Sequence, residues 1–234
     1  MRLHLALLGA ALLAALSPVT AGAAGGPPID WDPAYCWQVG GTYNNLPSGG
    51  QFQMVGIISA FGEPFTDLNA GDPSKEYTFY VHGLISQGTG TDALGTQEYY
   101  TTNYTGGTIE IYEDTSPDAS FSPGPPLGPN IANFTDGTLI LSGSFTSFTV
   151  ESNNNTLFKS GNIEGDLVWT GGTLLAETYG AGGSHCPGLL VGGSTWTSSV
   201  VIPGYIFRHF GKLDIQCPVP TRNPTWGRIK QLYR

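Results

Sequence analysis

The stretch EYTFYVHGLI, residues 76–85, decides the fold because its apolar and polar side chains alternate. Successive side chains of an extended chain point to opposite faces of its sheet. One face carries Tyr77, Phe79, Val81 and Ile85, and the other carries Glu76, Thr78, Tyr80 and His82. The stretch therefore predicts a strand that is buried on one face and hydrated on the other, which is typical of antiparallel sheets.

The same spacing of two recurs along the chain from Gln51 to Cys217. It places Ile109 and Ile111 inward, and further along Ile163, Leu167 and Trp169. The apolar positions between residues 139 and 150 change phase, which predicts a β-bulge near Thr146 or Ser147. Gly211 and Lys212 lie between two apolar runs, which predicts a two-residue hairpin turn.

These patterns predict an all-β fold, namely an antiparallel β-sandwich or jelly roll of about eight to ten strands with a short C-terminal helix. Two segments are predicted to be loops rather than strands: residues 115–133, which contain five prolines, and the Gly-rich residues 180–198. The alternative is a parallel β-helix, because four phrases in which Gly is followed by a β-branched or apolar pair resemble its rungs. Those phrases start 30, 24 and 11 residues apart, which is irregular for stacked rungs.

The first 23 residues predict a cleaved secretory signal peptide. Arg2 precedes an apolar run from Leu5 to Leu16, and small residues end at Ala23. A bilayer requires about 20 consecutive apolar residues, so no transmembrane segment is predicted. We expect a secreted protein, located outside the cell, on its surface or in a periplasm, with one β domain over 24–218.

The charge of the chain excludes nucleic-acid binding. The formal net charge is −9, the pI is near 4.6, and only 12% of the residues are charged. Such a surface repels phosphate. All 18 acidic residues precede residue 219, whereas the last 16 residues hold four basic residues and no acid. Residues 219–234 therefore predict a Pro-rich spacer followed by a basic amphipathic tail, which either sorts or attaches the protein or packs on its acidic body.

Three cysteines in an exported chain leave one without an internal partner. Cys186 and Cys217 are each followed by Pro, and we predict that they form the disulfide. Cys36 is then a buried free thiol, although it could replace either partner, since spacing does not determine connectivity.

Asp67, Asn69 and Asp72 are weak calcium candidates, because oxygen ligands at nearly alternate positions around a Gly suit a hard cation. The segment lacks the further ligands of a full calcium loop, and the same residues are typical of turns. No other cofactor is predicted. His82, His185 and His209 could together hold zinc, but no two of them have local ligand spacing.

Catalysis has one candidate pair, Glu164 and Asp166, which share a strand face about 6.6 to 7 Å apart. Two carboxyls at such a separation can serve as acid and base in glycoside hydrolysis. A third carboxylate is missing from the neighbouring sequence, where Val168 and Trp169 stand.

Aromatic residues make up 12% of the chain, and Tyr80, Tyr99 and Tyr112 fall on or near polar faces. Exposed rings can stack on sugars, whereas buried ones fill the core. We therefore expect a non-enzymatic surface or extracellular binding or structural protein of unknown ligand, with a glycan or the cell envelope as candidate partner. The alternatives are a carbohydrate-binding module and a glycoside hydrolase that uses Glu164 and Asp166.

Overall fold

A computed structural model describes residues 27–95, 97–122, 131–154, 160–180, 183–195 and 201–217. The predicted signal peptide (1–23) and the predicted tail with its helix (219–234) lie outside the described residues.

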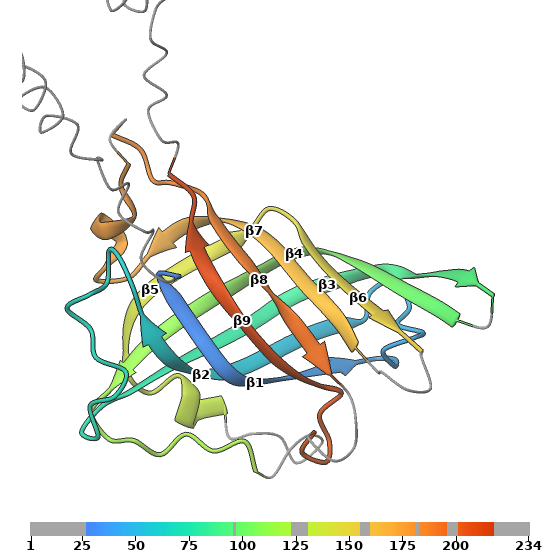
Figure 1. The fold of residues 1–234 in the computed structure, drawn as a ribbon, viewed down its shortest axis with the longest axis horizontal. Helices are drawn as coiled ribbons and strands as arrows, with labels where there is room; N and C mark the ends of the chain where they lie inside the picture. The colour runs from blue at the N-terminus through green and yellow to red at the C-terminus, as the bar shows by residue number, and fades with distance from the viewer. Residues whose placement is uncertain are drawn as a thin grey trace, which may run out of the picture.

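Strands dominate the described chain, and only two short 3₁₀ helices accompany them (Figure 1). In chain order the elements are β1 (Ile29–Val39), β2 (Gln51–Phe61), β3 (Glu76–Leu94), β4 (Gln97–Asp114), η1 (Ile131–Phe134), β5 (Thr138–Phe145), β6 (Phe148–Asn153), β7 (Ser160–Gly171), η2 (Leu175–Thr178), β8 (Gly188–Thr195) and β9 (Phe207–Ile215). The prediction of an all-β fold is confirmed.

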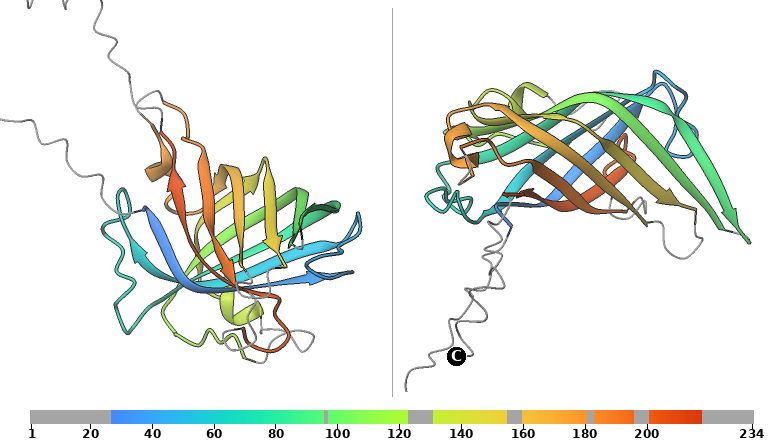
Figure 2. Two further views of the ribbon diagram at one scale, coloured as in Figure 1. Left: turned by 45° about the vertical axis from the view of Figure 1, so that its right-hand side comes forward. Right: turned by 90° about the horizontal axis from the view of Figure 1, so that it is seen from above.

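Eight strands close into an antiparallel barrel. The order β3-β2-β1-β9-β8-β7-β5-β4 returns to β3 through the pairing of β3 with β4, and every pairing is antiparallel. The extra strand β6 continues the position of β5, since both pair with β4 and with β7. Figure 2 shows the sheet curling round until its edges meet.

The closed barrel corrects both predicted architectures. A sandwich or jelly roll needs two sheets, whereas here one sheet packs against itself. A β-helix needs parallel rungs, and all the strand pairings are antiparallel. The alternation of side chains indicates which face of a strand is buried, but a sandwich and a barrel bury a face equally well. The predicted strand number of about eight to ten agrees with the nine observed.

The predicted bulge is confirmed between β5 and β6. Phe145 lies opposite Leu167, but Thr149 lies opposite Glu164, so the bulged strand carries one more residue than β7 over this span. The backbone N–H groups of Thr146 and Ser147 both point to the carbonyl oxygen of Asp166, at 2.8 and 3.4 Å. The bulge allows one chain segment to serve as β5 and β6 while apolar side chains remain inside.

One residue of the opening stretch faces the opposite way from its prediction. Tyr77, Phe79 and Val81 are buried as expected, but Leu84 is buried in place of Ile85, which is 36% exposed. Gly83 lies between Val81 and Leu84 and has a φ of 72°, a conformation that favours glycine, and the strand changes phase there.

Two further predictions are wrong because they interpret glycines as turn or loop residues. The predicted hairpin at Gly211 and Lys212 does not form, because β9 runs through both residues. The predicted loop over 180–198 contains β8, which includes Gly188, Gly192 and Gly193. These glycines lie where a larger residue would collide with a neighbour. A Cβ on Gly188, for example, would lie 2.6 Å from the side chain of Leu167. They are strand residues that make room for packing.

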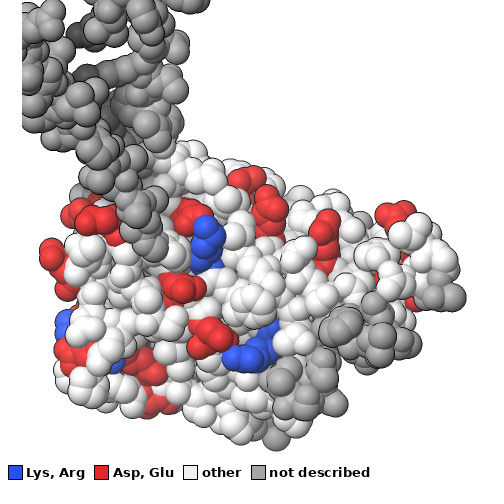
Figure 3. Space-filling model, viewed as in Figure 1, with Lys and Arg blue, Asp and Glu red and all other residues white. Residues whose placement is uncertain are grey.

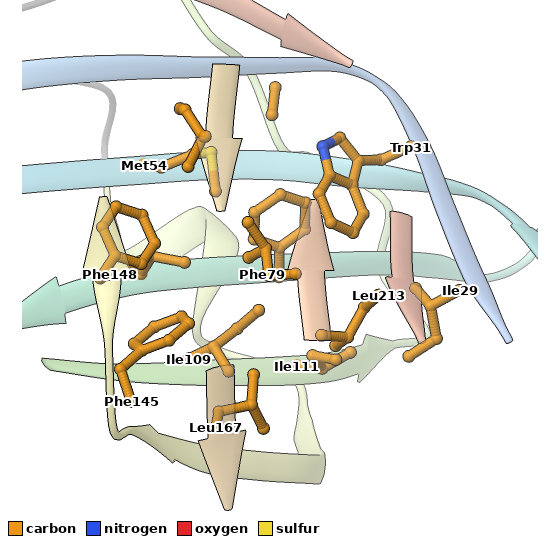
Figure 4. Packing of buried hydrophobic residues seen from close by; sticks show 14 of the residues in the cluster. Ile29, Trp31, Met54, Phe79, Ile109, Ile111, Phe145, Phe148, Leu167 and Leu213 are labelled. Carbon is orange, nitrogen blue, oxygen red and sulfur yellow. The ribbon is translucent and has the colours of Figure 1, made fainter. Parts of the chain in front are cut away.

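Apolar side chains fill the barrel interior (Figure 4). Trp31 and Phe79 lie with their ring centroids 4.9 Å apart, and both are at most 1% exposed. Trp169 belongs to the same cluster, in phase with Ile163 and Leu167 as predicted. An eight-stranded barrel is just wide enough for its inward side chains to fill it.

The loop after β4 covers part of the outer face of the barrel. Phe134 packs there in a second apolar cluster with Tyr35, Trp37, Val55 and Tyr205. Glu76 holds this loop in place, because its Oε1 accepts the backbone N–H groups of Asp118 and Ala119 at 3.0 and 2.9 Å. The described part of the predicted loop over 115–133 is therefore an attached covering layer.

We expect Glu76→Gln to loosen this covering loop. A neutral amide oxygen accepts the two N–H groups more weakly than a carboxylate, at a cost of about 1 kcal/mol. Hydrogen exchange at the Asp118 and Ala119 amides should accelerate, whereas the control Glu63→Gln, on an exposed turn, should leave both amides unchanged. Unaltered exchange in the Glu76 variant would contradict the assigned role.

Candidate functional site

The predicted disulfide is confirmed: Cys186 and Cys217 are bonded, and Cys36 is a buried free thiol. Burial raises the pKa of the Cys36 thiol well above its ordinary value. The reactive form of a cysteine is the thiolate. Cys36 is therefore a packing residue of the interior and a poor nucleophile.

The three histidines of the described residues lie in three different settings. His82 contacts Glu110 on the outer face of β3 and β4 at 3.3 Å, and His185 contacts the hydroxyl of Thr178 at 2.7 Å. His209 is fully buried, and its Nδ1 accepts the Trp31 indole N–H at 3.1 Å. Among the described residues, none of the three joins a group that could hold a metal ion.

The calcium candidates form turns. The side-chain oxygen of Asn69 accepts the Gly71 N–H at 3.0 Å. Asp72 accepts both the N–H and the hydroxyl of Ser74, at 2.9 and 2.7 Å, and these hydrogen bonds lower its pKa. Such contacts are those of turn residues. A calcium site at Asp67, Asn69 and Asp72 stays a prediction.

A different carboxylate group has the spacing of a cation site. Oxygen atoms of Glu76, Asp114 and Asp118 lie within 4.8 Å of one another. Glu76 already accepts two loop N–H groups, and Asp114 accepts the N–H of Ser116 at 2.9 Å. These contacts attach the covering loop, whereas the buried Oδ2 of Asp114 has no hydrogen-bond partner among the described residues.

Glu164 and Asp166 both point outward from β7, as predicted, and are exposed. Asp166 accepts a hydrogen bond from the Ser147 hydroxyl at 2.8 Å. Glu164 lies in a groove of about 540 Å³ on the outside of the barrel. We call this the outer groove, and it is lined by Ser147, Thr149, Glu151, Asn162, Ile163, Glu164, Val191 and Gly192.

The strand register explains which side chains meet there. One row across the outer face runs from Glu151 on β6 through Asn162 on β7 and Gly193 on β8 to Phe210 on β9. The next row runs through Thr149, Glu164, Val191 and Lys212. Paired residues on the same face of neighbouring strands lie about 5 Å apart. Asn162 and Glu164 on β7 thereby lie two strands from Phe210 on β9, and Glu151 on β6 lies three strands from it.

The ring of Phe210 lies against Gly193, beside the outer groove. A Cβ on Gly193 would lie 2.6 Å from Phe210 Cζ and 3.0 Å from Cε2, so the ring occupies the space that a side chain there would fill. Phe210 is nevertheless 50% exposed. The result is an apolar platform next to hydrogen-bonding groups. The Gly192-Gly193 pair was its only signal in the sequence.

The outer groove is acidic. Glu151 and Glu164 are exposed, and no ion pair within the described ranges neutralises either of them. The nearest cation in the rows, Lys212, bonds Asp214 at 2.7 Å. Figure 3 shows this side of the molecule, with many more Asp and Glu than Lys and Arg.

A second hollow of about 370 Å³ extends the outer groove toward β4. It shares Glu151 and Asn162 and adds Tyr99 and Asp92, the latter near the tip of the hairpin that β3 and β4 form beyond the barrel (Figure 1). Tyr99 is 40% exposed, and its hydroxyl bonds Gln97 at 2.8 Å.

The other two predicted tyrosines lie away from the outer groove and are half-buried. Tyr80 stacks on His82 with ring centroids 4.6 Å apart, and its hydroxyl donates to Gln53 at 2.5 Å. Tyr112 donates to Glu110 at 2.9 Å. Both lie on the outer face of β3 and β4 and are held by their neighbours. Tyr99, in contrast, lines the second hollow.

Within the described part of the chain, no helix has the length and the apolar character needed to cross a membrane. No protein-family model matches the chain, and neither a curated protein nor a solved structure matches it.

Proposed function

We propose that the protein is an exported, non-enzymatic binding protein that holds a carbohydrate chain in its outer groove. The observation that carries this proposal is the half-exposed ring of Phe210, which lies on Gly193 beside a groove lined by carboxylate, amide and hydroxyl side chains. Export is supported by the signal-like residues 1–23.

Carbohydrates combine the two properties that the outer groove offers to a ligand. One face of a sugar ring carries mostly C–H groups, which pack on an aromatic ring. Its edge carries hydroxyls, which donate to the oxygens of Glu151, Glu164 and Asn162. A few polar groups that fix orientation beside an apolar surface are typical of ligand sites.

The dimensions also suit a sugar chain. Asn162 and Phe210 are separated by two strand spacings, about 10 Å. The hollow that leads toward Tyr99 gives a longer chain a path across β7, β6 and β4. A binding site of several sugars gains affinity through repeated weak contacts.

We expect Phe210→Ala to weaken polysaccharide retention at least tenfold, because the stacking surface is lost. Retardation of the mature chain in gels containing cellulose, chitin, chitosan or pectin fragments measures the effect. Phe210→Tyr should bind like the wild type. So should Val168→Ala, which removes an exposed apolar side chain of β7 outside the outer groove. Absence of retention by every polysaccharide, or equal retention of Phe210→Ala, would reject the proposal.

Glycoside hydrolysis is the second candidate, and one observation favours it. Glu151 and Glu164 are diagonal neighbours, whose Cα atoms typically lie about 7 to 8 Å apart. Two carboxyl groups that point outward in parallel from such positions have the spacing of inverting glycosidases. However, a general acid is usually kept protonated by an apolar pocket, and both residues are exposed.

A hydrolysis assay distinguishes carbohydrate binding from glycoside hydrolysis. We expect no release of reducing sugar from a broad panel of glycosides and polysaccharides incubated with the wild type. Hydrolysis that disappears in Glu164→Gln and in Glu151→Gln, while binding persists in both variants, would establish the enzyme instead.

A further inference from the structure

On the basis of the proposed function, we infer that the outer groove selects cationic glycans, that is, polymers of sugars with free amino groups, over neutral and anionic ones. Glu151 and Glu164 carry this inference, together with the platform formed by Phe210.

The two carboxylates face the same ligand space. Glu151 lies opposite Asn162, and Glu164 lies two residues further along β7, so the pair flanks the amide of Asn162. All three side chains are exposed and line the outer groove. An ammonium group has three donors and no acceptor, which matches a site with several acceptor oxygens.

Among the residues that the structure describes, the cations nearest to this surface are paired with carboxylates. Lys212, in the row of Glu164, bonds Asp214 at 2.7 Å, and Arg208, further along β9, bonds Asp32 at 2.5 Å. Asp166 on β7 and Asp92 at the second hollow add further negative charge. A uronate or a sulfated sugar would meet uncompensated repulsion, whereas an amino sugar supplies the missing positive charge.

Phe210 fixes the position of a bound sugar relative to the two carboxylates. A sugar stacked on this ring lies on the Gly193 row, so its substituents extend toward Asn162 and the two carboxylates. The ring then provides affinity for any sugar, and the carboxylates provide the preference for an amino group. Exposed charge pairs typically change binding a few-fold each. Two such pairs predict about a tenfold preference for an amino-sugar oligomer over its N-acetylated form.

The test uses the full mature chain and three oligomers of equal length: glucosamine, N-acetylglucosamine and galacturonate. Calorimetry at about pH 5.5, where the amino sugar is charged, and at low salt should rank them in that order. The preference for glucosamine should shrink at high salt, because salt screens exposed charges. In Glu151→Gln combined with Glu164→Gln, glucosamine and N-acetylglucosamine should bind within about twofold of each other.

The control combines Glu63→Gln with Asp136→Asn. Both residues are exposed, and neither lines the outer groove, so this variant should keep the tenfold preference. A preference that survives in the Glu151/Glu164 variant overturns the inference, and the proposed function stands if Phe210→Ala still loses binding. If no oligomer binds either the wild type or a chain that ends at Pro220, the proposed function fails and the inference with it.

The basic C-terminal residues are the other source of positive charge. A chain that ends at Pro220 distinguishes them from the glycan. Equal ranking of the three oligomers with and without the tail supports the inference. If the oligomers bind only after truncation, the tail occupies the outer groove, and the inference is overturned.

Discussion

The barrel is expected to lose on the order of 4 kcal/mol of stability between pH 6.5 and pH 3 through one buried side chain, His209. Burial lowers its pKa to about 3 from the ordinary value of 6.5. Above pH 6.5 the imidazole is neutral in both the folded and the unfolded chain. Below that pH the unfolded chain binds a proton that the folded barrel excludes. The stabilisation is therefore complete above pH 6.5 and is lost as the pH falls toward 3.

The structure shows why His209 stays neutral. Its Nδ1 accepts the Trp31 N–H, which is possible only for an unprotonated nitrogen, and the groups facing it include the backbone of Gly192 and Gly211. A proton added there would break the Trp31 hydrogen bond and place a charge in the apolar interior.

Urea unfolding at pH 7, 6, 5 and 4 measures this effect in the wild type and in His209→Gln. The glutamine oxygen can still accept from Trp31, and it does not titrate. The variant should lose much less stability than the wild type over this range. Carboxylates with lowered pKa values, such as Glu113, titrate in both proteins and cancel in the difference.

His82→Gln is the matched control, because His82 lies on the outer face of β3. It should follow the wild-type pH profile. NMR titration of the wild-type His209 ring gives a second readout that needs no variant, with no change of its chemical shifts expected between pH 7 and 4. A ring that titrates near pH 6.5 would show that the expected acid sensitivity is wrong.

Removal of the disulfide has the other large expected effect. Replacement of Cys186 and Cys217 by Ser should cost about 3 to 4 kcal/mol, because the bond closes a loop with a sequence separation of 31 residues. The loss corresponds to a decrease in the melting temperature of about 10 °C for a domain of this size. The bond joins the end of β9 to the segment that enters β8, so reduction should release the end of both strands.

Thermal unfolding with and without a reductant tests this expectation. The reductant should lower the melting temperature of the wild type to that of the double variant and leave the double variant unchanged. Cys36→Ala should keep the full response to reductant, since Cys36 is outside the bond. A wild type that melts at the same temperature in both conditions would contradict the proposed contribution.

The alternation of side chains predicted the strands well, because the burial of one face is a local property of an extended chain. Tyr77, Phe79 and Val81 are buried as expected, and the phase change near Thr146 marks a real bulge. The same reasoning failed at glycines, where it predicted a turn or a loop and the structure has strands. A glycine in the sequence is read as a turn, whereas Gly192 and Gly211 are small because neighbouring strands and His209 occupy their space.

The candidate site was predictable only in part. Glu164 was recognised as an outward carboxylate from its own strand, but Glu151 and Phe210 were not connected with it. Their meeting depends on the register of β6, β7, β8 and β9, which joins positions up to 59 residues apart in the chain. Registers between strands depend on long-range packing of the interior and on the bulge, and no local pattern contains them.

The amino-acid sequence by itself determined that this protein is a β protein with an acidic, polar exterior, and it predicted the Cys186–Cys217 disulfide that the structure confirms. Only the tertiary structure decided that the strands close into one barrel, that a glycine of β8 makes room for Phe210, and that Glu151 and Glu164 share the outer face with that ring. The physical reason is that periodicity and charge are properties of neighbouring residues, whereas closure and register arise when distant strands bury their apolar faces against one another.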